Sequence, residues 1–392
     1  MESSIEGSFY IRKFKSNLEI DFMFLIFIYK STFIRHMIMK KKLRVVDMFC
    51  WCWWLSYGFE MAWFDVVAWV DNFQEALSVF EKNHKGSKWL NLDLFDDKSL
   101  DTIVEECWPE KIDVIIWWPP CQWFSLTWTR DENDKRNKLF YSMFNLAKKL
   151  NPSVILIENV PWLATLYDWK AKDAIIEQFE SLWYNYKYQV LYAPDYWVPQ
   201  IRKRLIFVWY KKWMGEFEFP KPIYNEESYV SCSDAISDLH DFDWDDLWSD
   251  VSEYKSKPLT PYQEMMRKWS EHLYNHVWTK HTENVINVIS QVPDWWNYKD
   301  LPEWVWWSRI FHEAWTRYNS KKPSKTIDTW HRNHFHYKYN RIPTVRENAR
   351  LQSFPDTFVF EWNKTKQYKM VWNAVPPLLG YNLAKQIKKL FK

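Results

Sequence analysis

The chain has 392 residues, with 52 Lys and Arg against 50 Asp and Glu, so its net charge is +2. A balance this close to neutral gives no global electrostatic argument for a nucleic-acid partner. With 47% hydrophobic residues, 18 Pro and only 5 Gly, the composition fits a globular chain of one large or two domains and excludes collagen-like and low-complexity sequences.

The amino-terminal segment does not predict a membrane span. Its longest apolar run, residues 22–29, is far shorter than the roughly 20 residues that cross a bilayer. No small-residue cleavage site follows, and residues 1–39 are therefore interpreted as an extension or a misassigned start. The five Cys include no CxxC pair, which argues against a disulfide framework or a zinc site and favours the cytoplasm.

Short apolar runs and amphipathic segments alternate between residues 40 and 212. The apolar runs predict strands over residues 43–49, 66–70, 112–116, 154–157, 188–192 and 205–208. Apolar residues at helical spacing predict helices over 139–147 and 175–182. Such alternation is typical of an α/β fold with a doubly wound, mostly parallel sheet, whose binding sites lie at the carboxyl ends of the strands.

The alternation stops after residue 212, and residues 213–345 predict a smaller, irregular second domain. Charge is segregated in it: residues 231–253 hold eight acids and no Lys or Arg, whereas residues 309–350 hold ten Lys and Arg and three acids. An amphipathic stretch over 376–391 predicts a closing helix. Residues 346–392 are accordingly expected to return to the first domain.

Several motifs follow the predicted strands in a fixed order. They are DMFCWCWWLSYGFE (47–60), an acidic strand end at Asp71, LDLFDD (92–97), PPCQWFS (119–125), ENVPW (158–162), QIRKR (200–204), RENARLQSFPD (346–356) and VWNAVPP (371–377). In content and order they resemble those of bacterial DNA cytosine-5 methyltransferases of the restriction-modification type. The resemblance covers residues 43–392 and implies a Rossmann-like, S-adenosylmethionine-dependent catalytic domain with a target-recognition domain.

The resemblance assigns the catalytic roles to four residues. Cys121, in a rigid Pro-framed loop after a strand, suits a nucleophile, although a buried structural Cys is the alternative for this residue taken alone. Its thiolate would add to carbon 6 of a flipped-out cytosine, while Glu158 would hydrogen-bond ring nitrogen 3. Arg202 and Arg204 would steady the base, the alternative being a solvated basic strand edge.

The cofactor implied by the resemblance is S-adenosylmethionine. The residues expected to hold it are Asp47, Phe49, Asp71, Asp93, Pro119 and Asn373. Asp71 would accept the ribose hydroxyls and Asp93 would contact the adenine, although either could simply end a strand. No metal is expected, because the His residues of HRNHFH (331–336) lack Cys or acidic partners at ligand spacing; a DNA-facing or surface loop is favoured there.

The sequence departs from the family at its glycines. The chain has 30 Trp and 5 Gly, where roughly 27 Gly would be ordinary. Trp51, Trp53 and Trp54 stand at the glycines of the cofactor loop, and further family glycines are Trp at 117, 118, 123, 162, 197, 209, 362 and 372. The pairs at 295–296 and 306–307 read as Gly-Gly turns. We interpret most of these Trp as UGA codons that the organism reads as glycine.

The predicted function is methylation of cytosine carbon 5 in a specific duplex DNA sequence through a covalent Cys121 adduct. One alternative is a tRNA cytosine-5 methyltransferase, although the Cys-Phe-Thr signature of that branch is missing from the sequence. The other is a catalytically dead DNA-binding protein, if the Trp are genuine and fill the cofactor loop. The basic 309–350 segment would face phosphates and the acidic 231–253 segment solvent or a partner. We expect a cytoplasmic monomer with no membrane partner, and a cognate restriction endonuclease acting on the same site.

Overall fold

The computed structural model describes residues 41–49, 54–84, 86–118, 135–161, 170–241, 249–306, 315–327 and 334–392. The chain divides into two units, Met1–Leu43 and Arg44–Lys392, and the fold described here is that of the second unit. Among the described residues, no helix is long and apolar enough to cross a membrane.

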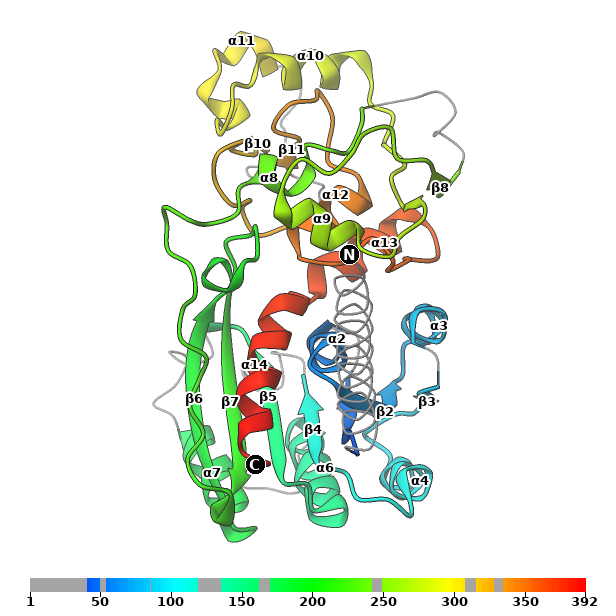
Figure 1. Ribbon diagram of the computed structural model, residues 1–392, viewed down its shortest axis with the longest axis vertical. Helices are drawn as coiled ribbons and strands as arrows, with labels where there is room; N and C mark the ends of the chain where they lie inside the picture. The colour runs from blue at the N-terminus through cyan, green and yellow to red at the C-terminus, as the bar shows by residue number, and fades with distance from the viewer. Residues whose placement is uncertain are drawn as a thin grey trace, which may run out of the picture. The chain divides into compact units, whose positions relative to one another are not determined.

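A seven-stranded sheet forms the centre of the first half of this unit (Figure 1). Its strands are β1 (Leu43–Met48), β2 (Phe64–Asp71), β3 (Lys88–Asn91), β4 (Val114–Trp117), β5 (Val154–Asn159), β6 (Tyr184–Tyr192) and β7 (Lys203–Lys211). Their order is β3-β2-β1-β4-β5-β7-β6, with β7 antiparallel to both of its neighbours and parallel pairing of β2 with β3, β1 with β4 and β4 with β5. The predicted α/β fold with a mostly parallel sheet is confirmed.

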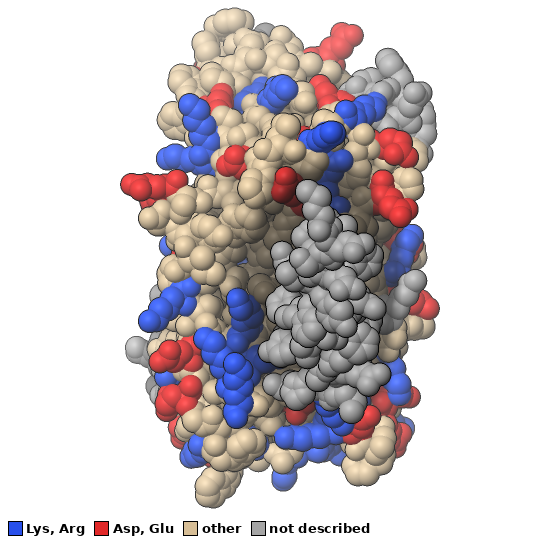
Figure 2. All heavy atoms as spheres, in the orientation of Figure 1, with Lys and Arg blue, Asp and Glu red and all other residues tan. Residues whose placement is uncertain are grey.

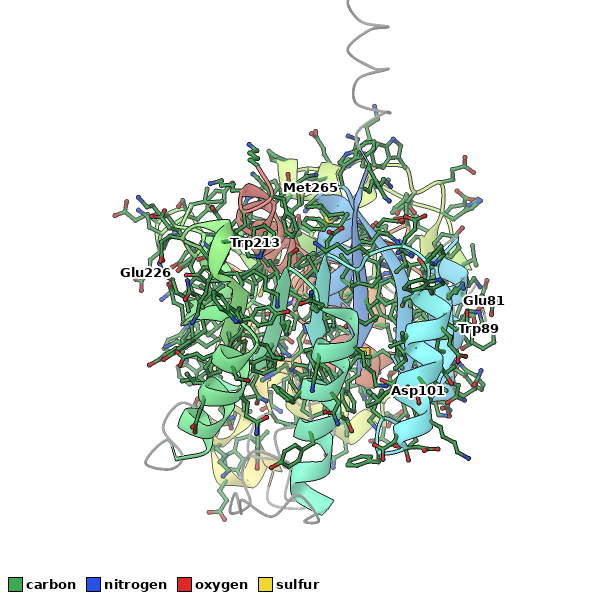
Figure 3. All side chains as sticks on the ribbon, turned by 90° about the horizontal axis from the view of Figure 1, so that it is seen from below. Glu81, Trp89, Asp101, Trp213, Glu226 and Met265 are labelled. Atoms are coloured by element: carbon green, nitrogen blue, oxygen red, sulfur yellow. The ribbon has the colours of Figure 1, made fainter. Side chains whose placement is uncertain are left out.

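Helices cover the sheet because each strand and each helix buries an apolar face. The helices of this part are α2 (Trp54–Met61), α3 (Gln74–Asn83), α4 (Asp97–Cys107), α6 (Lys135–Leu150), α7 (Lys170–Ser181) and α14 (Pro377–Lys389). Seen from below, α4, α6 and α7 lie on one side of the sheet and α14 lies on the other (Figure 3). Leu100, Met143 and Phe179 bring α4, α6 and α7 into one core with alternate residues of β1, β4, β5 and β7.

Two glycines let α14 lie directly on α2. A Cβ at Gly58 would lie 2.4 Å from the backbone nitrogen of Tyr381, and a Cβ at Gly380 would lie 2.7 Å from the backbone oxygen of Leu55. Real Cβ atoms do not approach backbone this closely, so any larger residue would push the helices apart. The close contact fixes the carboxyl-terminal helix against the helix that follows the 50–53 loop.

The rest of the unit is built from short elements, as the loss of alternation after residue 212 predicts. They are η3 (Ala193–Tyr196), η4 (Lys212–Met214), α8 (Cys232–Ile236), β8 (Val251–Ser252), α9 (Pro261–Arg267), β9 (Leu273–Tyr274), α10 (Glu283–Gln291), η6 (Tyr298–Asp300), α11 (Glu303–Trp306), β10 (Thr316–Arg317), β11 (His334–Phe335), α12 (Val345–Leu351) and α13 (Lys364–Asn373). Only two-stranded sheets, β8-β9 and β10-β11, occur among these described residues.

Arg341 and Arg350 of the basic segment pair with Asp241 and Asp238 of the acidic segment, so the expectation that these segments face phosphates and solvent is wrong for these residues. Arg350 is fully buried and forms ion pairs with Asp238 at 2.5 Å and with Asp356 at 2.6 Å. Arg341 pairs with Asp241 at 3.1 Å and with Glu347 at 2.7 Å. Buried guanidinium groups need carboxylate partners, and distant parts of the sequence supply them. On the face shown in Figure 2, positive and negative side chains lie side by side in several places.

The prediction of a DNA-facing or surface loop is wrong for the described part of HRNHFH. His334 and His336 are both buried. The ring nitrogen Nδ1 of His336 accepts the backbone N–H groups of Lys338 and Tyr339, each at 3.0 Å. Burial lowers the pKa of His336 to about 3, so this ring is a neutral acceptor that holds a turn.

Candidate active site

The strand order reverses between β1 and β4, and at such a point the carboxyl ends of neighbouring strands leave a crevice for ligands. Asp47 lies near the end of β1 and is buried. The hydroxyl of Ser56, also buried, on α2, donates a hydrogen bond to the Asp47 carboxylate. Burial raises the pKa of Asp47 to about 7, and the nearby charge of Asp71 contributes to the rise. The pair therefore links α2 to the end of β1.

Asp71 and Asp93 lie at the ends of adjoining segments. Asp71 ends β2, is buried, and accepts the backbone N–H of Phe73 at 2.8 Å. The backbone N–H of Leu92 donates to the Asp71 carbonyl at 3.0 Å, which brings the 92–96 turn to the end of β2. Asp93 is exposed in that turn and accepts the N–H of Phe95 at 3.0 Å. The two carboxylates thus belong to one edge of the sheet.

Phe49 directly follows β1 and turns the chain sharply. Its φ is +59°, a left-handed conformation that non-glycine residues adopt rarely. Its backbone N–H donates to the carbonyl of Val70 at 2.9 Å, and its ring centre lies 5.9 Å from that of Trp117 at the end of β4. The aromatic side chain therefore lies at the same edge as Asp47 and Asp71.

Glu158 and Arg204 form an ion pair on the neighbouring strands β5 and β7. The distance from Arg204 Nε to Glu158 Oε1 is 2.5 Å, and the carboxylate is fully buried. Burial raises the pKa of Glu158 to about 7, against the opposing charges of Arg204 and Arg202. A carboxyl group with this pKa is able both to accept and to give a proton near neutral pH.

Arg202 joins this strand pair to the carboxyl-terminal segment. It is buried, and its guanidinium donates to the carbonyl of Trp372 at 3.0 Å and, more weakly, to the side-chain oxygen of Gln200 at 3.5 Å. Asn373 follows Trp372 at the end of α13 and is half-buried. The structure thus brings Arg202 and the last motif together.

Two of the predicted site residues, Pro119 and Cys121, lie outside the described residues. The last described residue before them, Trp118, donates its backbone N–H to the carbonyl of Met48 at 3.4 Å. This bond holds Trp118, at the end of β4, beside the end of β1. At the ends of β1 and β2, Asp47 and Asp71 offer carboxylates that accept hydrogen bonds. On β5 and β7, Glu158 and Arg204 offer a carboxyl group paired with a guanidinium group.

Sequence reasoning missed two residues of this edge. Ser56 has a usable signal, since it lies nine residues after Asp47 on a helix that must face the sheet. Gln200 lies inside the QIRKR motif, is fully buried, and has a side-chain nitrogen with no acceptor among the described residues. Within those same ranges, no group of three or more His, Cys, Asp or Glu is placed to hold a metal ion.

Comparison with known proteins covers nearly the whole unit. Residues 43–389 match the family of C-5 cytosine-specific DNA methylases. Type II methyltransferase M.DdeI of Desulfomicrobium norvegicum is 31% identical over 89% of each chain, and Type II methyltransferase M1.HphI of Haemophilus parahaemolyticus is 32% identical over 94% of this chain and 92% of its own. The fold is similar to that of a putative DNA modification methyltransferase from an Escherichia coli prophage, with a TM-score of 0.72, 24% identity, and coverage of 89% and 99% of the two chains.

Proposed function

The chain belongs to the C-5 cytosine-specific DNA methylase family, and on that premise we propose that Cys121, Glu158, Arg202 and Arg204 carry its reaction. It is a DNA cytosine-5 methyltransferase, which methylates cytosine in DNA with S-adenosylmethionine as the methyl donor. The observation that supports the assignment of roles is the ion pair of the buried Glu158 with Arg204, next to the buried Arg202.

Carbon 5 of cytosine is a weak nucleophile, and the proposed residues activate it. The base is first flipped out of the duplex, because the target atom cannot be reached inside the stack. The Cys121 thiolate forms a bond to carbon 6 while Glu158 hydrogen-bonds ring nitrogen 3 and stabilises the protonated ring. The resulting enamine places electron density on carbon 5, which would take up the donor's methyl group before the carbon 5 proton is lost. Loss of the carbon 5 proton and breaking of the Cys121–carbon 6 bond then restore the aromatic ring.

Arg204 and Arg202 have different supporting roles in this proposal. Arg204 contacts Glu158 directly and holds its carboxyl group towards the base. Arg202 acts through the backbone, since its bond to the Trp372 carbonyl keeps the last motif against the strand pair. Asn373 would then close the cofactor pocket.

The carboxylates at this edge of the sheet fit S-adenosylmethionine, which when bound supplies an electrophilic methyl group. Its ribose hydroxyls and adenine amino group are hydrogen-bond donors, and Asp71 and Asp93 present carboxylates at one edge of the sheet. Phe49 adds an aromatic face. Asp47, held by Ser56, would orient the 50–53 loop, and Pro119 would bound the pocket.

The cofactor loop requires glycine, and we propose that Trp51, Trp53 and Trp54 stand at glycine positions through UGA codons read as glycine. A loop between strand and helix that approaches a cofactor needs backbone free of side chains. Three indoles would occupy the volume that the ligand needs. We call the chain with glycine at these three positions the restored chain.

The remaining assignments concern partners and organisation. We propose that residues 213–345 read the target sequence, that residues 346–392 complete the catalytic domain, and that residues 1–39 are an extension or a misassigned start. We further propose a cytoplasmic monomer, with a cognate restriction endonuclease acting on the same site, because the relatives are Type II methyltransferases. The methyltransferase and the endonuclease would then act on the same DNA sequence.

The proposal is tested by methyl transfer from S-adenosylmethionine to duplex DNA and, separately, to tRNA. The restored chain is expected to methylate DNA, and Cys121→Ser is expected to abolish transfer. Cys107→Ser is the matched control, because Cys107 is a buried free thiol of the core that belongs to none of the motifs. Full activity of Cys121→Ser would remove that thiol from the mechanism, and transfer to tRNA alone would contradict the choice of substrate.

A further inference from the structure

Tryptophan is concentrated at left-handed backbone positions. Ten described non-glycine residues have positive φ, and six of them are Trp. Trp makes up 30 of 392 residues, so fewer than one of ten would be expected by share. Left-handed φ brings Cβ against the neighbouring carbonyl, and bulky residues adopt it least readily, whereas glycine adopts it freely. An enrichment of Trp at positive φ is the opposite of what the conformational preference of Trp predicts.

Two of these residues occupy the same structural position. Trp63, with φ +66°, lies between α2 and β2, and Trp183, with φ +65°, lies between α7 and β6. Each follows its helix by two residues and directly precedes its strand. Each donates its backbone N–H to the carbonyl three residues earlier, Glu60 at 2.9 Å and Glu180 at 3.0 Å. A left-handed residue just past a helix end is the position at which glycine is strongly enriched.

The other four also lie in turns. Trp197 caps η3 with φ +69° and ψ 22°, and Trp269, with φ +67°, follows α9. Trp295, with φ +64°, is the third residue of a turn closed by the Trp296 N–H and the Pro293 carbonyl, where positive φ calls for glycine. Trp362, with φ +75°, precedes the N-cap of α13.

Packing does not account for five of these side chains; the sixth, Trp197, is half-buried beside Tyr224 and Tyr262. The indole of Trp183 is 71% exposed and that of Trp269 is 83% exposed. Trp63, Trp295 and Trp362 are also exposed, and all five follow different elements. An exposed indole buries little apolar surface, so its packing does not offset the cost of a positive φ.

A second, independent sign lies inside the sheet region. The indole nitrogens of Trp69, Trp117, Trp118 and Trp209 are buried and have no acceptor among the residues that the structure describes. Buried indole N–H groups normally find a partner. The rings of Trp69, Trp117 and Trp209 pack against other aromatic side chains, but each of the four indole N–H groups lacks a hydrogen bond within the described part of the chain.

We propose that the six left-handed tryptophans are glycine positions, and that the protein made in its own cells carries glycine there. The positions are Trp63, Trp183, Trp197, Trp269, Trp295 and Trp362. The assignment comes from backbone conformation alone and therefore reaches Trp63, Trp183 and Trp269, which no motif marks. UGA codons read as glycine would place glycine at all six at once. Trp315, which has no positive φ, is not assigned.

The first test compares three residues at one site. In the restored chain with glycine also at the six positions, position 183 is returned to Trp or changed to Ala, and urea unfolding is measured. Both are expected to shift the unfolded-to-folded ratio towards unfolding, by about 5- to 30-fold relative to glycine. Alanine separates the backbone effect from the indole, since it lacks the ring but keeps the unfavourable Cβ.

The matched control is Trp89 on the edge strand β3, which projects at the sheet edge in Figure 3. Its φ is not positive, so Trp89→Ala should be more stable than Trp89→Gly, the reverse of the order at position 183. Alanine as stable as glycine at position 183 would overturn the proposal. Peptide masses of the protein isolated from its own cells give an answer that does not depend on folding: glycine at the six positions is expected, and tryptophan there would refute the assignment.

Discussion

Replacement of Glu158 by Gln tests whether a protonated carboxyl group acts on the base. With a pKa of about 7, roughly half of the Glu158 side chains are protonated at pH 7. At the ordinary value of 4.5 the share would be about one in 300. Gln keeps an oxygen that accepts from Arg204 but has no proton to give. The expected loss in kcat is about 10²- to 10⁴-fold, the usual contribution of a positioned acid or base.

The assay is steady-state methyl transfer to duplex DNA over a range of pH. In the unsubstituted chain, kcat/KM should rise with pH as Cys121 ionises and fall about tenfold per pH unit above 7 as Glu158 loses its proton. Glu158→Gln should lose the falling limb. Glu177→Gln, at an exposed position of α7, should leave the profile unchanged.

Stability gives a second readout of the same group. Because burial raises the pKa of Glu158, the folded chain holds a proton that the unfolded chain releases between pH 4.5 and about 7. Stability from this group therefore falls as pH rises through that window, by on the order of 2–4 kcal/mol, and Glu158→Gln should remove this dependence. The reasoning would be refuted if kcat/KM of Glu158→Gln still fell above pH 7 and if the pH dependence of its free energy of unfolding were unchanged.

Three further predictions concern binding and stability. Ser56→Ala should raise KM for S-adenosylmethionine by about 2- to 10-fold with little change in kcat, because one hydrogen bond to Asp47 is lost, and Ser56→Thr should largely rescue it; an unchanged KM in both would contradict the role of the pair. Arg350→Met should lower the free energy of unfolding by about 3–5 kcal/mol in urea, because it removes the nearest cationic partner of the buried Asp238 and Asp356. The less buried Arg267→Met should cost less; equal losses would count against the buried network. His336→Asn should weaken the loss of stability on acidification, since burial lowers the pKa of this His to about 3 and its contribution is lost as pH falls from 6.5 towards that value; an unaltered acid limb would exclude it.

Strand-helix alternation predicted the sheet because buried parallel strands are continuous apolar runs. The runs at 43–49, 66–70 and 154–157 correspond to β1, β2 and β5 within a few residues. β3 went unrecognised, since its residues KWLN are mostly exposed and carry no apolar run. An edge strand of this kind is defined by pairing with β2, which a local pattern does not show.

Site residues could be predicted where a motif follows a strand. Contacts between residues that are distant in the sequence could be predicted less well. Glu158 and Arg204 come from separate motifs, and the antiparallel pairing of β5 with β7 brings them together. Ser56 and Gln200 lie inside motifs, but their part in the site depends on burial and hydrogen bonding, which the sequence does not show. Charge segregation misled for a similar reason, because Asp238 and Arg350 are 112 residues apart yet neutralise each other in the core.

The most direct test of the central claim is a covalent trap. Duplex DNA that carries fluorine at carbon 5 of cytosine cannot lose a proton from that carbon, so the Cys121–carbon 6 bond should persist after methyl transfer. With the restored chain and S-adenosylmethionine, we predict a stable protein–DNA adduct that peptide mass analysis locates at Cys121. Methyl transfer to ordinary DNA without any such adduct, or an adduct at Cys50 or Cys52 instead, would contradict the proposed mechanism.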